Sequence, residues 1–204
     1  MTKRNNKGIM YNGQLLEVDT KLKIIKVYDN GNLVKLIKDV WLGKNGCATK
    51  DNMHEGGMKT PFGDYYLGVA FGNENINISY PYIKIDDNSY WVDDVKSKYY
   101  NYFVQVGDRK NNVNYPYVVN LLVKDFDSAE HLIDYEKAYR YAVFIEYNCN
   151  NLDHEVISGK GSAIFLHCHG TKRYTGGCVA IKEKDMEWVL KFLNYEKRPK
   201  IIIK

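Results

Sequence analysis

The sequence has few cysteines and no long apolar run. Its four cysteines, Cys47, Cys149, Cys168 and Cys178, contain no C-x-x-C pair, and four among 204 residues are too few for a disulfide-built scaffold. This spacing also argues against a zinc ribbon or a thioredoxin-like redox motif. A disulfide between Cys168 and Cys178 stays open as an alternative. No stretch of 18 apolar residues occurs, so we expect no membrane-spanning helix.

A block of like charges is also missing. The formal net charge is +4, and lysines alternate with aspartates and asparagines, so the charge pattern does not predict nucleic-acid binding. The N-terminal residues 1–13 are basic and polar and lack the apolar segment of a signal peptide. Two alternatives follow: a protein that works in the cytoplasm, or a mature chain from which an export signal has been removed.

The residue present in excess is tyrosine. The chain contains 18 tyrosines, whereas its shares of apolar (45%) and charged (26%) residues are ordinary for a globular protein. Tyrosine favours strands and half-exposed surfaces, so we predict a β-rich domain with an aromatic face. No repeat, low-complexity tract or linker divides the chain. We therefore predict a single domain over residues 1–204.

Short apolar runs predict the order of the strands. Three runs near the N-terminus, with the turn signal Asp29–Asn32 between the second and the third, are typical of a β-meander. Later in the chain, Met186, Val189, Leu190 and Leu193 follow the spacing of a helix with one buried face. The predicted strands are residues 14–19, 21–28, 33–41, 65–71, 141–147, 163–166, 179–181 and 200–204.

Other stretches are less regular. Residues 72–127 contain only short apolar pieces, and we interpret residues 80–100 either as a cover over a substrate cleft or as a surface excursion. The pattern of residues 128–133 predicts one or two helical turns. His54 and Glu55 lie in a glycine-rich segment and are interpreted as exposed loop residues.

The chemistry is expected in residues 161–181. A buried strand, Ala163–Leu166, delivers His167 and His169 at its end, and a glycine-containing loop turns the chain back into a hairpin partner that begins at Cys178. A histidine and a cysteine at the ends of adjacent strands can lie within hydrogen-bond reach. A thiolate nucleophile activated by an imidazolium requires this arrangement. The alternative is a structural histidine beside a core cysteine.

The glycines and the strand alternation refine this interpretation. Gly176 and Gly177 precede the cysteine and leave backbone N–H groups uncovered, where they can hold the oxyanion of a tetrahedral intermediate. His169 is predicted on the same face as His167, as a partner or a second contact, and Cys168 on the opposite face, in the core.

The motifs around this stretch resemble the L,D-transpeptidase catalytic domain, the YkuD family. The likeness rests on SAIFLH followed by TGGCVAI, an amphipathic helix and a final strand, and it is greatest to the branch with a T-x-G-C nucleophile motif, here residues 175–178. It extends over about residues 35–204. Further similar segments are GKNG at 43–46, HEGGMKTPFG at 54–63, YWVDD at 90–94 and YAVFIEYN at 141–148.

The resemblance implies a mainly β fold, a mixed sandwich or barrel-like arrangement with a few short helices. It implies a cysteine-dependent L,D-transpeptidase that joins peptidoglycan tetrapeptide stems, donor and acceptor, through a thioester. Transfer to water would make it an L,D-carboxypeptidase. Cys178 would be the nucleophile and His167 the base, and carbapenems would acylate the thiolate. No cofactor and no metal are implied, and the site would lie outside the cytoplasm, at the cell wall.

The chain departs from the family pattern at two positions. Gly176 stands where most members have a histidine, and Ala180 stands where most have an arginine. We expect Arg173 and Tyr174, with Lys172, to replace these substrate contacts, alongside Thr175, Gly176 and His169.

Three other functions compete with this one. A papain-like hydrolase requires the cysteine before the histidine, which is the reverse of the order here. A zinc-dependent cell-wall peptidase could use His167, His169 and Cys178, because H-x-H on a strand can chelate one ion. A non-catalytic binding domain would require an unreactive Cys178.

Overall fold

The strand-forming runs of the sequence pair into two main sheets. The structure, a computed structural model, describes residues 11–109, 112–151 and 155–204. Its strands and helices are β1 Gln14–Asp19, β2 Ile24–Asp29, β3 Asn32–Lys38, β4 Cys47–Ala48, η1 Lys50–Asn52, β5 Thr60–Pro61, β6 Gly63–Gly72, β7 Tyr82–Lys84, β8 Ser89–Val92, β9 Phe103–Val106, β10 Val118–Leu121, β11 Ala129–His131, η2 Leu132–Tyr135, η3 Ala138–Arg140, β12 Ala142–Ile145, β13 Phe165–Cys168, β14 Val179–Ile181, α1 Glu183–Phe192, η4 Tyr195–Lys197 and β15 Lys200–Ile203.

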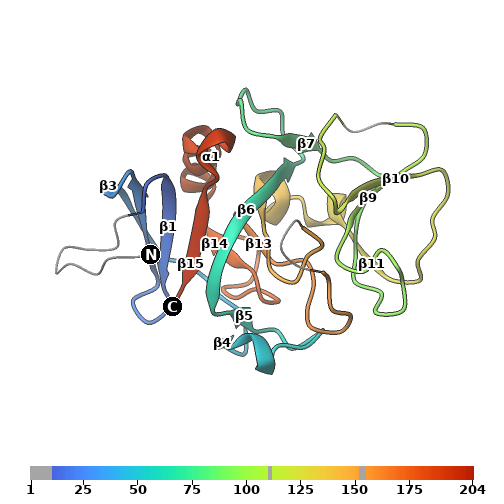
Figure 1. Cartoon of the computed structure of the whole chain (residues 1–204), viewed down its shortest axis with the longest axis horizontal. Coiled ribbons are helices and arrows are strands. Elements are labelled where there is room, and N and C mark those ends of the chain that lie inside the picture. Colours follow the sequence, from blue (N-terminus) through green and yellow to red (C-terminus); the bar gives the residue numbers. More distant parts are fainter. Residues whose placement is uncertain (1–10, 110–111, 152–154) are drawn as a thin grey trace.

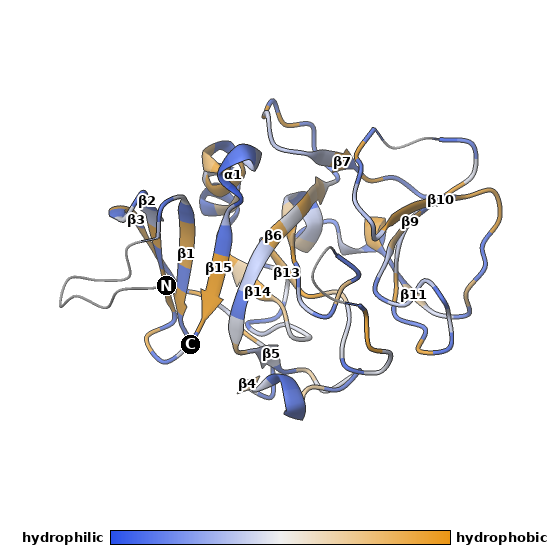
Figure 2. Ribbon diagram, viewed as in Figure 1, coloured by the Kyte–Doolittle hydropathy of each residue, from blue (hydrophilic) through white to orange (hydrophobic). Residues whose placement is uncertain are grey.

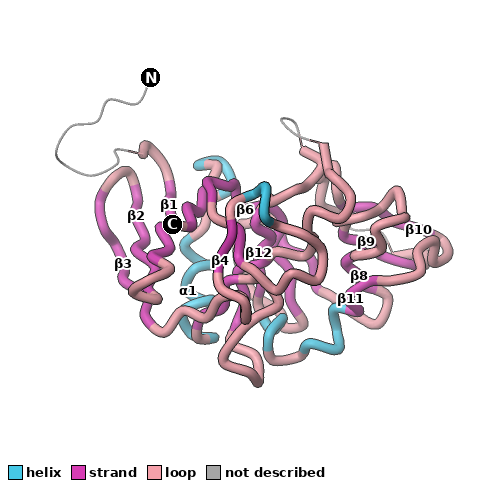
Figure 3. The backbone as a smooth tube through the Cα atoms, turned by 90° about the horizontal axis from the view of Figure 1, so that it is seen from below, coloured by secondary structure: helices cyan, strands magenta, loops and turns pink. Residues whose placement is uncertain are grey.

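In the described part of the chain, the larger sheet has nine strands. Its order is β14-β13-β12-β6-β15-β1-β2-β3, and β7 pairs with β6. A second sheet has the order β10-β9-β8-β11, and β4 pairs with β5. Figure 1 and the turned view of Figure 3 place β1–β3 at one end of the molecule and β8–β11 at the other. The predicted fold class is confirmed: mostly β, in a barrel-like or sandwich arrangement with one short α-helix.

The predicted N-terminal meander is confirmed. β1, β2 and β3 pair antiparallel in sequence order, and Asn30 and Gly31 turn the chain with φ of 49° and 80°. Two positive φ values in succession are typical of the tight turn that matches strand twist. β1 also pairs parallel with β15, so the two ends of the described chain lie in the middle of the sheet.

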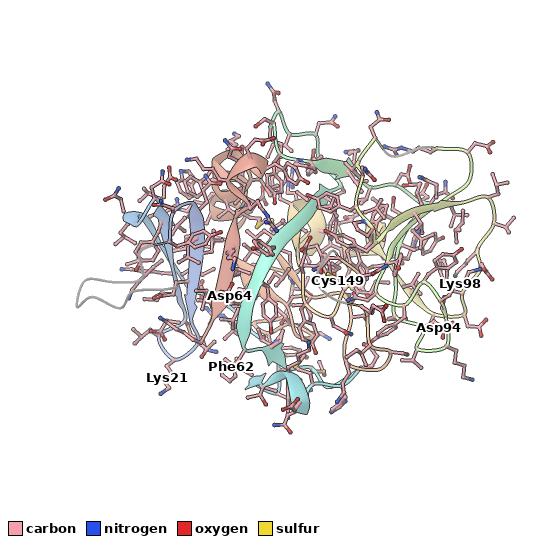
Figure 4. All side chains as sticks on the ribbon, in the orientation of Figure 1. Lys21, Phe62, Asp64, Asp94, Lys98 and Cys149 are labelled. Carbon is pink, nitrogen blue, oxygen red and sulfur yellow. The ribbon has the colours of Figure 1, made fainter. Side chains whose placement is uncertain are left out.

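Alternating residues of the strands pack into two apolar clusters. On β13, Leu166 and Cys168 belong to one cluster and Phe165 to the other. The predicted helix is confirmed as α1, and its Met186, Val189 and Leu190 are fully buried in the first cluster. Figure 2 shows hydrophobic residues gathered on β1, β6 and β15, whereas many charged side chains lie at the outer surface, such as Lys21 at one end and Asp94 at the other (Figure 4).

Residues 72–127, the stretch predicted to be irregular, contain more regular secondary structure than their composition predicts. Its apolar pieces become β9 and β10, and with β8 and β11 they form the second sheet. Residues 80–100 are not a surface excursion, because Trp91, Val92 and Tyr100 are almost fully buried and Trp91 packs against Phe144 and Phe165. The sequence pattern hides this sheet because tyrosine and asparagine separate its short apolar pieces.

Two local predictions are wrong. Residues 129–131 are strand β11 rather than a helical turn, since they pair antiparallel with β8, and a 3-10 turn follows only at Leu132–Tyr135. The strand predicted at 163–166 begins at Phe165, because Ala163 adopts a positive φ of 52°. Within the described residues, no helix combines the length and apolar character needed to cross a membrane.

Candidate active site

The two residues proposed for catalysis come from neighbouring strands. His167 lies within β13, and Cys178 lies directly before β14. The expected hairpin is wrong: β13 and β14 run parallel, with Leu166 opposite Val179, and the loop between them carries the chain back to the same edge. A parallel pair still brings the two side chains to one face. Both line a cavity of about 460 Å³.

The Cys178 thiol is held by the backbone that leads into β13. Its Sγ donates to the Ala163 carbonyl at 3.2 Å and accepts the Phe165 N–H at 3.3 Å. The residue is only 6% exposed. The positive φ of Ala163 therefore has a consequence for the site, because it turns the Ala163 carbonyl toward the sulfur.

The His167 ring is oriented by a backbone carbonyl. Its Nδ1 lies 2.6 Å from the Cys168 oxygen, and since a carbonyl only accepts, Nδ1 carries the hydrogen. This leaves Nε2 deprotonated, as a general base requires. Tyr139 packs edge-on against the ring, with centroids 5.5 Å apart. No hydrogen bond joins His167 to Cys178 among the described residues, so a proton transfer needs a small side-chain movement or a bridging group.

Burial sets the charge of both groups. It lowers the pKa of His167 from 6.5 to about 4, and it raises the pKa of the Cys178 thiol well above its ordinary value, with a further rise from the nearby Glu130 carboxylate. Both shifts therefore disfavour the imidazolium–thiolate pair that the sequence suggested. The resting pair is a thiol and a neutral imidazole.

Two threonines fix the loop that ends at Cys178. The Thr175 hydroxyl donates to the Cys178 carbonyl at 2.7 Å and accepts the Gly177 N–H at 3.1 Å. Thr60, fully buried in β5, accepts the Gly43 N–H at 2.8 Å and lies 3.4 Å from the same carbonyl. No residue pattern around Thr60 indicated this role, which is visible only in the structure.

The other predicted substrate contacts divide into two groups. Tyr174, Thr175 and Gly176 line the cavity, as does Lys172, whereas Arg173 is exposed and is not part of the lining. Gly177 is also outside the lining, and its N–H is engaged by Thr175.

His169 contacts the cavity indirectly. Its ring stacks on Trp41 with centroids 3.6 Å apart, and its Nε2 donates to the Asp39 carbonyl at 2.9 Å. Trp41 lines the cavity, but His169 does not. His169 therefore acts on the cavity wall by holding Trp41.

Three carboxylates of the cavity were missed as site residues. Glu55, Asp93 and Glu130 line the same cavity as Cys178. The interpretation of Glu55 as an exposed loop residue is wrong, because it is partly buried and accepts hydrogen bonds from Tyr100 at 2.5 Å and from Ser162 at 2.8 Å. Glu55 and Asp93 lie in the segments HEGG and YWVDD that resemble the family, which was the available signal.

The alternatives of the sequence analysis find no support in this geometry. The four cysteines are free, and Cys168 and Cys178 lie in different clusters, so they form no disulfide. In the part of the chain that is described, no three histidine, cysteine or acidic side chains converge as metal ligands. A larger cavity, about 580 Å³ between Tyr66, Tyr115 and Tyr195, contains neither His167 nor Cys178 and is separate from this chemistry.

Comparisons with known proteins point to one family. The sequence matches the family model described as the L,D-transpeptidase catalytic domain, YkuD, over residues 13–203. A search of curated proteins found no match.

Solved structures show a similar fold. A mutant form of the helical cell shape determining protein Pgp2 from Campylobacter jejuni is 16% identical, with a TM-score of 0.50, over 95% of this chain and 47% of that one. An L,D-transpeptidase from Mycobacterium smegmatis is 10% identical, with a TM-score of 0.44, over 94% and 58%. LdtMt1 in complex with imipenem is 12% identical, with a TM-score of 0.40, over 95% and 59%.

The chain therefore spans about half the length of the Pgp2 structure that it matches. The family match, in contrast, extends over nearly all of the chain and includes β13, the following loop and β14. The chain belongs to the YkuD family of L,D-transpeptidase catalytic domains.

Proposed function

We propose that this domain is a cysteine-dependent L,D-transpeptidase that joins peptidoglycan stem peptides through a thioester on Cys178. The observation that carries the proposal is that Cys178 and His167 line one cavity, with His167 Nε2 left free as a base. Family membership supports the reaction class. The T-x-G-C motif of residues 175–178 supports assignment to that branch of the family.

The first half of the reaction forms the acyl-enzyme. His167 Nε2 takes the thiol proton as Cys178 Sγ attacks the peptide carbonyl, and a C–S bond forms. The C–N bond then breaks, and the protonated His167 gives its proton to the leaving amine. We assign the oxyanion to the Cys178 N–H with Gly176, because Thr175 already accepts the Gly177 N–H.

The second half transfers the acyl group. An acceptor amine attacks the thioester, loses a proton to His167 and forms the new amide, and the proton returns to the sulfur as the C–S bond breaks. Water in place of the amine gives carboxypeptidase activity. The second candidate function is thus trimming of stem peptides at the same site. Either activity implies that the protein acts outside the cytoplasm, where peptidoglycan is located.

A carbapenem tests the nucleophile directly, because its strained carbonyl acylates a competent thiolate. We expect intact-protein mass spectrometry with imipenem to show one adduct, which peptide mapping assigns to Cys178. Cys178→Ala should abolish the adduct, and Cys47→Ala, at a cysteine outside the cavity, should leave it unchanged. An adduct mapped to Cys47, Cys149 or Cys168 would falsify the assignment.

A further inference from the structure

The cavity of about 580 Å³ that lies outside the proposed catalytic site is rich in tyrosine. Tyr66 lies on β6, Tyr115 precedes β10 and Tyr195 begins η4, so three distant segments supply its aromatic rings. A volume of this size is typical of cavities that bind small ligands. The excess of tyrosine in the sequence therefore has a local counterpart that the proposed transpeptidase reaction does not use.

A second cavity adjoins the first. It measures about 480 Å³, shares Tyr66, Glu196 and Arg198 with the larger cavity, and adds Tyr11 to the lining. The shared residues join the two cavities into one elongated groove, which we call the tyrosine groove. Among the described residues, the groove has no lining residue in common with the cavity that holds Cys178.

The groove also contains an oriented carboxylate. Glu146 accepts the Tyr117 hydroxyl at 2.9 Å and the side-chain amide of Asn151 at 3.3 Å. Gly68 on β6 makes room for this arrangement, because a Cβ at that position would collide with the Tyr117 hydroxyl and approach the Glu146 carboxylate to 3.0 Å. Glu146 and Asn151 both line the groove. A planar acceptor and a planar amide are thus held in place beside the aromatic rings.

One buried hydroxyl in the groove lacks a partner. Within the described part of the chain, the Tyr115 hydroxyl oxygen is buried without a hydrogen bond. Buried polar atoms are normally hydrogen-bonded, so this hydroxyl indicates a partner that the chain does not supply. The Tyr195 ring packs edge-on against Tyr115, with centroids 6.1 Å apart, and is 49% exposed. Because exposed side chains change rotamer readily, a movement of Tyr195 can open the Tyr115 hydroxyl to a ligand.

We propose that the tyrosine groove binds a neutral oligosaccharide built of pyranose units. A pyranose ring has an apolar C–H face that packs on an aromatic ring, and its hydroxyl groups both donate and accept hydrogen bonds. The accessible Tyr195 ring supplies the aromatic surface. Glu146 and Asn151 supply acceptors and donors for the hydroxyl groups. Two adjoining cavities suit a chain of sugars, and the inference does not rest on the proposed function.

Two other ligand classes fit the groove less well. Proline-rich peptides also bind aromatic grooves, but their X–Pro bonds have no N–H to donate to the carboxylates of Glu146 and Glu196. A phosphorylated or otherwise polyanionic ligand would meet like charge at the same two carboxylates. The guanidinium of Arg198 lies 4.5 Å from the centroid of the Tyr66 ring, so the groove presents both signs of charge. Hydroxyl groups can bond to both.

An NMR titration of the wild-type protein tests the binding. The probes are triacetylchitotriose and cellotriose, which share the β-linked pyranose chain and differ in the acetamido group, and a polyproline peptide is the third arm. We expect at least one trisaccharide to bind with a Kd of about 1 mM or lower and to shift the amides of Tyr66, Tyr115 and Tyr195.

The two trisaccharides distinguish the parts of the sugar that are recognised. Binding of both supports recognition of the pyranose ring, and binding of triacetylchitotriose alone supports an added contact with the acetamido group. No shift at ~10 mM of either trisaccharide would overturn the proposal, since that concentration exceeds the expected Kd about tenfold. Shifts confined to the Cys178 cavity, or tighter binding of the polyproline peptide, would overturn it as well.

Matched tyrosine variants locate the site. We expect Tyr195→Ala to lower the affinity for the trisaccharide at least ~10-fold, because the aromatic surface is lost, whereas Tyr195→Phe keeps the ring and should retain most of the affinity. Tyr99→Ala removes a partly exposed tyrosine between β8 and β9, outside both cavities, and should bind as the wild type does. An unchanged affinity in Tyr195→Ala, or an equal loss in Tyr99→Ala, contradicts the assignment.

A conservative change tests the polar half of the groove. Glu146→Gln keeps the shape of the side chain and an oxygen for the Tyr117 hydroxyl, but it removes the charge. Hydrogen bonds to an ionised acceptor are stronger than those to a neutral one, so we expect the affinity to fall by about 3–10-fold. Unchanged affinity would contradict the contact between this carboxylate and the sugar.

Imipenem acylation separates the groove from the proposed catalytic site. Tyr195 lies outside the cavity that holds Cys178, so Tyr195→Ala should form the adduct at the wild-type rate while it loses the trisaccharide. A loss of both would overturn the proposal, because the substitution would then act on the fold and not on the groove. If the wild type forms no adduct, the proposed function fails, and the NMR titration still decides the groove.

Discussion

The protonation states of Cys178 and His167 follow from their burial. Because Cys178 and His167 are almost fully buried, each favours its neutral form. In the proposed mechanism, the imidazole therefore acts as a neutral base rather than as the cationic half of an ion pair. The Cys168 carbonyl orients it, which is the role that a third group plays in other nucleophile–base pairs.

Replacement of each histidine should separate the base from its neighbour. We expect His167→Ala to lower kcat/KM for acyl transfer by at least ~100-fold, because a general base is lost. His169→Ala removes the stacking partner of Trp41 and should have a smaller effect, mainly on KM. Steady-state kinetics on both variants would check this, and a larger loss in His169→Ala would reassign the base.

The pH dependence follows from the lowered pKa of His167. A base with a pKa of about 4 stays neutral as the pH falls from 7 to 5, so kcat/KM should hold to about pH 5 and then decline. The profile is best measured in Glu130→Gln protein, which lacks the carboxyl of pKa about 7. An acid limb near 6.5 would mean that the imidazole is not buried as the structure has it.

At the element scale, the loop between β13 and β14 decides where the sulfur lies. Gly177 has a φ of 147°, and a Cβ there would lie 2.8 Å from the Lys59 carbonyl. Gly176, its neighbour, has no atom within 4 Å of the position of a Cβ. Alanine substitutions at the two glycines therefore form a matched pair, in which only the one at Gly177 meets a steric clash.

We expect Gly177→Ala to destabilise the fold by about 1–3 kcal/mol and to slow imipenem acylation, since the backbone must shift around Cys178. Gly176→Ala should change the free energy of unfolding by less than ~0.5 kcal/mol. Urea denaturation and acylation rates would measure both. Equal effects of the two substitutions would contradict the loop geometry.

The contact between β5 and the nucleophile loop is a second element-scale feature. Thr60→Val removes the hydroxyl that binds the Gly43 N–H and faces the Cys178 carbonyl, so we expect a loss of about 1–3 kcal/mol in unfolding free energy. Thr60→Ser retains the hydroxyl and should recover most of it. Thermal unfolding monitored by circular dichroism would show the difference, and a Ser variant as weak as Val would assign the effect to packing.

The stability of the whole molecule depends on pH through two buried groups, Glu130 and His167. The pKa of Glu130 is raised in the folded state, from 4.5 to about 7, so the folded state binds more protons than the unfolded state in this range. Its contribution to stability is complete below pH 4.5 and is lost as the pH rises through 7. His167 has the opposite sign: its lowered pKa costs stability as the pH falls from 6.5 to 4.

Comparison of the wild type with Glu130→Gln isolates the carboxyl. We expect the wild type to lose about 2 kcal/mol more than the variant between pH 4.5 and pH 8, since one unit of pKa shift corresponds to about 1.4 kcal/mol and the partial exposure of Glu130 reduces the full value. Urea denaturation at several pH values would measure it. Parallel curves for the two proteins would show that the carboxyl is not perturbed.

The local elements, and the two strands that position His167 and Cys178, follow from the sequence. The helix of residues 183–192 followed from its 3.6-residue period and the meander from Asn30-Gly31. Two apolar runs indicated the neighbouring strands that bring His167 and Cys178 to one cavity. The spacing of apolar residues indicates which face of a helix or strand is buried. The helix, the meander and the two strands follow mainly from this local spacing.

Only the tertiary structure decided the rest. Strand direction between β13 and β14, the sheet within residues 72–127 and the meeting of Glu55, Asp93 and Glu130 all depend on pairings between distant segments. The neutral charge state of Cys178 and His167 also depends on these pairings, because burial shifts their pKa values. The residue type alone does not reveal how deeply a side chain is buried.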